Sequence, residues 1–144
     1  MIEKDTIRLL RECDAGVAMG IESIDEVLPF CKSKRLKGRL EYCRSEHDKL
    51  NAEIKAALDR FHDDGKAPNP ILKGMSWMKT NMKLSMDSSD HTIADLMTDG
   101  CNMGVKSLNR YLNEYQAADE HAKDITKRLI ALEEQLATDI RDFL

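Results

Sequence analysis

An internal repeat constrains the fold of this chain more than any other feature of its sequence. The pattern Cys-x-x-Gly-Val occurs at Cys13–Val17 and again at Cys101–Val105. Each copy lies in a long segment with helical periodicity. Each is followed by a second such segment that carries a Glu-His pair, Glu46-His47 in the first case and Glu120-His121 in the second. The sequence therefore predicts a helical hairpin that occurs twice.

Four segments carry apolar residues in steps of three and four, which places those residues on one face of an α-helix. They predict helices from about Asp5 to Phe30, from about Ser33 to Asp63, from about Asp90 to Tyr115, and from within 113–119 onward. The predicted core stripes are Leu10, Cys13, Val17, Ile21, Ile24, Leu28 and Cys31; Leu36, Leu40, Cys43, His47, Leu50, Ile54, Leu58 and Phe61; Ile93, Met97, Cys101, Gly104, Leu108, Tyr111 and Tyr115; and Ala118, His121, Ile125, Leu129, Leu132, Leu136 and Ile140.

Local signals predict where two of these helices end. Pro29 lacks a backbone amide and should end or kink the first helix near Val27 or Leu28. Gly65 follows the second helix as its expected C-terminal stop. On the last helix, charged side chains such as Glu133 are assigned to the solvent-facing side, where residues of opposite sign alternate.

The connection between the two hairpins is unusually long. Residues 65–70 contain a glycine and two prolines and cannot be helical. From Ile71 to about Met86 an amphipathic stretch, which includes Trp77, predicts a short helix that crosses and covers the bundle. An up-down-up-down bundle would not need such a connection, whereas a ferritin-like bundle does. We therefore predict an all-α, ferritin-like four-helix bundle in one domain, 1–144, with hairpins at about 5–64 and 88–144 and a crossover at about 65–87.

The composition excludes some partners. Hydrophobic residues make up 42% and charged residues 33% of the 144, with only 7 glycines and 3 prolines, as expected of a helical globular domain. The net charge of −4 argues against nucleic acid, because phosphate binding needs a basic face. Basic residues do cluster in 32–39, and we interpret them as a solvated hairpin connection in preference to a patch for an anionic ligand.

The sequence also predicts a cellular compartment. The first residues lack the basic and apolar regions of a signal peptide, and no apolar run approaches the roughly 20 residues of a membrane span. The four cysteines form no Cys-x-x-Cys pair. We therefore expect a cytoplasmic protein in a reducing environment, without a membrane partner.

A metal centre in the bundle core is the sharpest chemical hypothesis. Ferritin-like di-iron proteins use Glu-x-x-His motifs, in which both side chains lie on one helix face, and this chain has none at the expected place. The adjacent pairs Glu46-His47 and Glu120-His121 point their side chains about 100° apart. Glu22 lies near the level of His47, so a contact between them is an alternative to an ordinary hydrogen-bonded core histidine. The candidate ligands for iron, manganese or zinc are Glu22, Glu46, His47, Glu120 and His121.

Cysteine chemistry is less favoured by the spacing. Cys13, His47, Cys101 and His121 are ligand types that zinc accepts. The helical rise of about 1.5 Å per residue, however, places Cys13 and His47 at heights that differ by about 12 Å. A catalytic role for Cys13 or Cys101 is also disfavoured, because burial on an apolar face raises the pKa of a thiol. We interpret both as small core residues.

Several stretches resemble a small ferritin-like family of bacterial proteins of unknown function, each built as one bundle with a duplicated hairpin. They are Arg11–Gly16, Glu46–Ile54, the Gly-Pro crossover with Gly74–Lys83, and Asp99–Leu112. Some relatives in the wider ferritin-like group bind iron or act in stress responses. Because the ligand motif is missing here, the resemblance implies the fold and carries over no metal residue.

The sequence favours a non-enzymatic protein that acts through protein contacts, with self-association into a homo-oligomer as the simplest form. The rival hypothesis is a metal-binding or redox protein with an irregular histidine and glutamate site in the core. No cofactor is predicted under the first hypothesis, and no catalytic residue is assigned under either.

Overall fold

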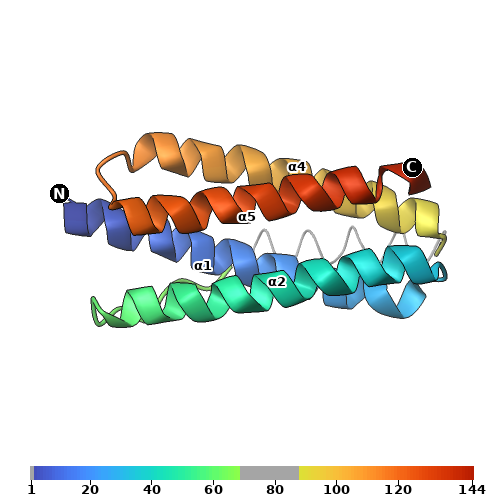
Figure 1. The fold of residues 1–144 in the computed structure, drawn as a ribbon, viewed down its shortest axis with the longest axis horizontal. Helices are drawn as coiled ribbons and strands as arrows, with labels where there is room; N and C mark the ends of the chain where they lie inside the picture. The colour runs from blue at the N-terminus through green and yellow to red at the C-terminus, as the bar shows by residue number, and fades with distance from the viewer. Residues whose placement is uncertain (1, 69–87) are drawn as a thin grey trace.

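The computed structural model describes residues 2–68 and 88–144, and within these ranges the only regular structure is helical. Four long helices pack side by side along one axis (Figure 1). They are α1 (Ile2–Val27), α2 (Lys34–Asp59), α4 (Asp90–Glu114) and α5 (Glu120–Asp139), with short 3-10 turns η1 (Leu28–Phe30) and η2 (Arg141–Phe143). The predicted all-α class with four main helices is confirmed. The short helix predicted around Trp77 lies outside the described residues.

The directions of the helices distinguish this bundle from a simple up-down-up-down arrangement. Helices α1 and α2 form one antiparallel hairpin, and α4 and α5 form another (Figure 1). The carboxylate of Asp90, at the start of α4, accepts hydrogen bonds from the backbone amides of Lys32 at 2.8 Å and Ser33 at 2.9 Å, just before α2. Helices α2 and α4 therefore begin at the same end of the bundle and run in the same direction.

The buried residues follow the predicted stripes closely. In α2 the stripe is buried at every position from Leu36 to Leu58, and Phe61 packs against it in a half-buried position. Cys13 and Cys101 are fully buried, as predicted. The apolar core consists of two clusters, one around Cys13 toward the N-terminal end of α1 and one around Cys101 toward the start of α4.

The helix ends agree with the prediction at α1 and differ at α2. Helix α1 ends at Val27, two residues before Pro29. Helix α2 ends at Asp59, because His62 adopts a left-handed conformation with φ of 54°. The amide of Asp63 then donates to Leu58 O at 3.1 Å, and the amide of His62 donates to Asp59 O at 3.0 Å. These two bonds form a Schellman motif, so His62, and not Gly65, stops the helix.

Two predictions for the last helix are wrong. His121 is exposed, and Ala122 takes the buried position next to it, because Asp119 caps α5 by accepting from the amide of Ala122 at 2.8 Å and thereby sets its phase. Glu133, assigned to the solvent-facing side, points inward instead, with only 14% of its side chain exposed. Among the described helices, none is long and apolar enough to span a membrane.

Candidate functional site

A buried polar pair lies between the two apolar clusters. His47 on α2 is 1% exposed, and its Nε2 lies 2.9 Å from Oε1 of Glu133 on α5. Along α2, His47 lies between Cys43 and Leu50, and these two residues belong to different apolar clusters. The prediction that His47 faces the core is confirmed. Its carboxylate partner is Glu133, whereas Glu22 lines a groove between α1 and α2.

Both ring nitrogens of His47 face oxygen acceptors. Nδ1 lies 2.8 Å from the carbonyl oxygen of Cys43, one turn earlier in α2, while Nε2 faces the Glu133 carboxylate. A neutral imidazole has only one N–H, so two such acceptors are satisfied best by the doubly protonated ring. The thiol sulfur of Cys43 also lies 3.5 Å from Nδ1. The geometry therefore favours an imidazolium paired with a carboxylate.

The electrostatics of the pair agree with this geometry. Burial by itself would lower the pKa of His47, because it disfavours the charged ring. The hydrogen bonds of the ring with the Cys43 side chain and the Glu133 carboxylate, together with the charges of these two groups, outweigh burial and raise the pKa of His47 to about 10. The ring is thus protonated at neutral pH and is held in place on both sides.

A glycine on α1 makes room for this pair. A methyl group on Gly20 of α1 would lie 2.9 Å from His47 Nε2, closer than real side-chain contacts allow. A methyl group on Gly104 of α4 would lie 3.6 Å from a Glu133 carboxylate oxygen, an ordinary contact, so this position does not require glycine. The spacing of Gly16 and Gly20, four residues apart in α1, predicts a close approach of another helix. Gly20 instead accommodates the His47 ring, and Gly16 lies beside the Leu129 side chain.

The buried thiols are not poised to react. Burial raises the pKa of Cys13 to about 11, and Cys13 Sγ lies 3.2 Å from Thr126 Oγ1. Burial and the neighbouring Glu133 carboxylate raise the pKa of the Cys101 thiol as well. Because the thiolate is the nucleophilic form, neither cysteine is activated at neutral pH.

Metal binding finds little support in this arrangement. Cys43, His47, Cys101 and Glu133 are all ligand types for zinc. Within residues 2–68 and 88–144, however, no three His, Cys, Asp or Glu side chains converge with the geometry to hold a metal ion. His47 would also have to release a proton and a hydrogen bond before it could donate a lone pair.

In the ranges that the structure describes, the five predicted ligands do not gather into one site. Glu46 pairs with Lys49 at 2.9 Å on the surface of α2, and Glu120 pairs with Lys123 at 3.8 Å with 92% of its side chain exposed. His121 faces Glu53 across the surface of α2 and α5. His47 alone reaches the core.

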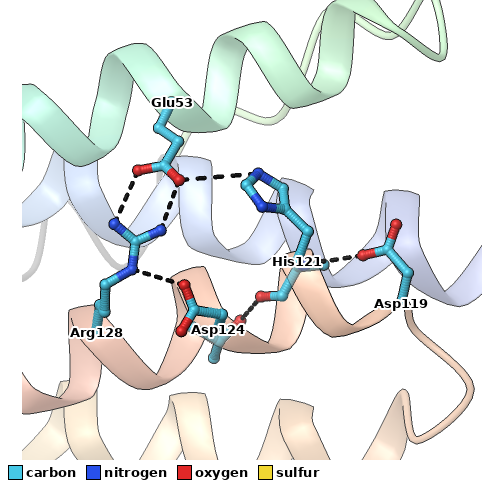
Figure 2. A network of polar contacts seen from close by, with 7 residues as sticks. Glu53, Asp119, His121, Asp124 and Arg128 are labelled. Atoms are coloured by element: carbon cyan, nitrogen blue, oxygen red, sulfur yellow. Dashed lines mark hydrogen bonds and ion pairs between the residues drawn. The ribbon is translucent and has the colours of Figure 1, made fainter.

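His121 belongs to a surface network that joins α2 to α5. Figure 2 shows Glu53 of α2 facing both Arg128 and His121 of α5, with Asp124 between these two along α5. Arg128 donates two hydrogen bonds to Glu53, at 2.6 and 2.9 Å, and one to Asp124 at 2.9 Å. The hydrogen bonds from Arg128 lower the pKa of Glu53. This bidentate clamp fixes the spacing of the two helices and leaves His121 at 3.8 Å from Glu53.

A second buried carboxylate was not anticipated from the sequence. Asp14 on α1 is 6% exposed and accepts from Lys55 Nζ at 3.1 Å and from the amide of Lys66 at 3.0 Å. It therefore ties α1 to α2 and to the chain that follows α2. Beside it lies an open groove of about 590 Å³, which Glu22, Asp48 and other residues of α1 and α2 line. Most of the polar side chains that line this groove already make contacts within the fold.

Comparisons of the chain with protein-family models, with curated proteins and with solved structures find no match. The resemblance to a ferritin-like family therefore stays a prediction.

The pairing of Glu133 with His47 was not predicted from the sequence, although a signal was present. Glu133 follows Leu129 by four residues and precedes Leu136 by three, which is the spacing of the core stripe itself. A carboxylate on that stripe would be costly unless paired, and His47 is the buried partner of opposite charge. Spacing alone thus predicts that His47 and Glu133 both face the core. It does not predict that they lie at the same level along the bundle axis.

Proposed function

We propose that this protein is a ferritin-like helical bundle without catalytic activity that acts through contacts with other protein chains, most simply by self-association. The observation that carries the proposal is the His47–Glu133 pair. The one histidine in the core is protonated and hydrogen-bonded on both nitrogens, so it is occupied by the fold and is not available as a base or ligand.

The surface supports contact with other proteins. Tyr42 on α2, Met103 on α4 and Phe30 on η1 are large apolar side chains that are 56%, 66% and 43% exposed. Tyrosine, phenylalanine and methionine are enriched where proteins meet. The shared direction of α2 and α4 supports the ferritin-like part of the proposal, because a connection that runs the length of the bundle is typical of that topology. The four free cysteines are in keeping with a cytoplasmic location.

Analytical ultracentrifugation across a wide range of protein concentrations tests the proposal. We expect a mass above that of the monomer, and we expect Tyr42→Ser or Met103→Ser to reduce it without lowering the melting temperature. Glu134→Gln, at another exposed position, serves as a matched control. A protein that is monomeric at every concentration would remove self-association from the proposal.

The second candidate is a metal-binding protein with an irregular core site. It is favoured by one observation, the gathering of Cys43, His47 and Glu133 in a buried layer. Metal analysis of protein purified without chelator separates the two candidates. Near-stoichiometric iron, manganese or zinc that is lost in His47→Gln would support the second candidate, because a ligand histidine couples metal to stability. A metal-free protein supports the first.

A further inference from the structure

The start of α2 carries positive charge in an otherwise acidic protein. Five of the eight residues 32–39 are Lys or Arg, and no acidic residue occurs between Glu26 and Glu41. All five side chains belong to exposed residues. We define the basic end as Lys32, Lys34, Arg35, Lys37 and Arg39.

The position of the basic end is unfavourable for the helix. The N-terminus of a helix carries roughly half a positive charge, so acidic residues stabilise it and basic residues destabilise it. Among the described long helices, α1, α4 and α5 each have an acidic residue in the first turn, and α2 has none. In its place, the Ser33 hydroxyl accepts from the Leu36 amide in the first turn, and Asp90 of α4 accepts from the amides of Lys32 and Ser33 just before it. Residues that lower the local stability of a helix, as these basic residues do, are expected where the surface has a function.

Ion pairs within the chain neutralise this charge only weakly. Arg35 lies 3.3 Å from Asp142, while Lys37 and Arg39 lie 4.0 Å from Glu41 and Asp139. The three basic side chains are 52–56% exposed, so each pair contributes about 1 kcal/mol at most. In the part of the chain that the structure describes, no carboxylate pairs with the side chain of Lys32 or Lys34.

Apolar surface adjoins the basic end. Phe30, two residues before Lys32, is 43% exposed. The guanidinium of Arg35 lies 4.6 Å from the centre of the Phe143 ring on η2. This end of the bundle therefore offers a partner both positive charge and an aromatic contact.

We propose that the basic end is a docking surface for an acidic segment of another protein chain. The inference rests on the proposed function and names the partner by its charge. The basic end spans roughly 14 Å, because two extended residues precede the helical rise of about 1.5 Å per residue that begins at Lys34, and about four extended residues match this length. A planar anionic membrane fits less well, because it would also cover Asp139, Asp142 and Glu41 beside the basic end and be repelled by them, whereas a narrow acidic segment can follow the basic side chains alone.

Fluorescence anisotropy with a labelled peptide of sequence Glu-Glu-Leu-Glu-Glu-Phe tests the docking surface. The double variant Lys32→Glu/Lys34→Glu should weaken binding by about tenfold or more, which corresponds to about 1.4 kcal/mol. The matched control Lys106→Glu/Lys127→Glu, with the same charge change at exposed sites elsewhere, should bind like the wild type. Raising salt from about 0.1 to 1 M, which shortens the screening length from about 10 to 3 Å, should weaken binding.

The same double variant should have a higher melting temperature than the wild type, because glutamate suits a helix N-terminus. A loss of binding then does not come from unfolding. The inference is overturned if the wild type does not bind the peptide, if both double variants lose binding equally, or if the protein binds phosphatidylserine vesicles and not the peptide. Self-association that persists in Lys32→Glu/Lys34→Glu would leave the proposed function standing in any of these cases.

Discussion

Glu133 on α5 lies 2.9 Å from Nε2 of His47 on α2, in the layer that separates the two apolar clusters of the core. This relationship fixes the register of the two helices. A shift of α5 by one turn would bury a carboxylate and an imidazolium without partners, which costs several kcal/mol. The apolar contacts on either side are non-directional and impose no comparable requirement on the alignment. We infer that the pair selects one alignment of the bundle.

Removing the carboxylate should destabilise the fold through its partner. We expect Glu133→Ala to lower the free energy of unfolding by about 3 kcal/mol, because it leaves the buried imidazolium of His47 unpaired. Chemical denaturation measures the change. Glu134→Ala, one residue further along and exposed, should change stability by less than about 0.5 kcal/mol. Equal effects of the two substitutions would contradict a buried ion pair.

Stability should fall as the pH rises above the ordinary pKa of histidine. The pKa of His47 is raised from 6.5 to about 10, so the folded state holds a proton that the unfolded state releases between these values. The contribution of the pair is complete below pH 6.5 and is lost as the pH passes through about 10, with a slope of at most about 1.4 kcal/mol per unit.

Ionisation of the buried thiols also lowers the stability of the fold at high pH, since burial raises the pKa of Cys13 to about 11. The difference between the wild type and His47→Gln therefore isolates the histidine. Denaturation curves at a series of pH values should show a steeper fall for the wild type between pH 6.5 and 9. Parallel curves for the two proteins would show that His47 does not titrate in this way.

Alanine should act in opposite directions at two glycines. Gly20→Ala should lower stability by about 1–3 kcal/mol, because the added methyl would lie 2.9 Å from the His47 ring and displace it from Glu133. Gly38→Ala, in α2, meets nothing within 4 Å and should raise stability by about 1 kcal/mol through helix propensity alone. Thermal melts of both variants check the signs, and a stabilising Gly20→Ala would contradict the tight fit.

Glycine should be an improvement at the end of α2. His62 has φ of 54°, which is unfavourable for a residue with a side chain and natural for glycine. We expect His62→Gly to raise the free energy of unfolding by about 0.5–1 kcal/mol, after the entropy cost of glycine in the unfolded chain. His62→Ala keeps the strain and should give no gain. Urea denaturation of the three proteins measures the order.

Particular residues show how far sequence reasoning reached. The α2 stripe from Leu36 to Leu58 could be predicted position by position, because its spacing allows only one buried face. His121 was misplaced, since a boundary in 113–119 left the phase of the last helix open until Asp119 set it. His62 was missed because a left-handed residue other than glycine or asparagine has no strong sequence signature. Both errors arise at helix ends, where local signals compete.

The sequence by itself determined the all-helical class, the four main helices and most residues that line the core, because helical periodicity and the pattern of apolar residues are local properties of the chain. Only the tertiary structure decided which polar groups meet inside. The pairing of His47 with Glu133, and of Asp14 with Lys55 and the Lys66 amide, depends on how far each helix is displaced along its neighbour. That displacement is set by contacts between residues distant in sequence, and helical periodicity carries no information about such contacts.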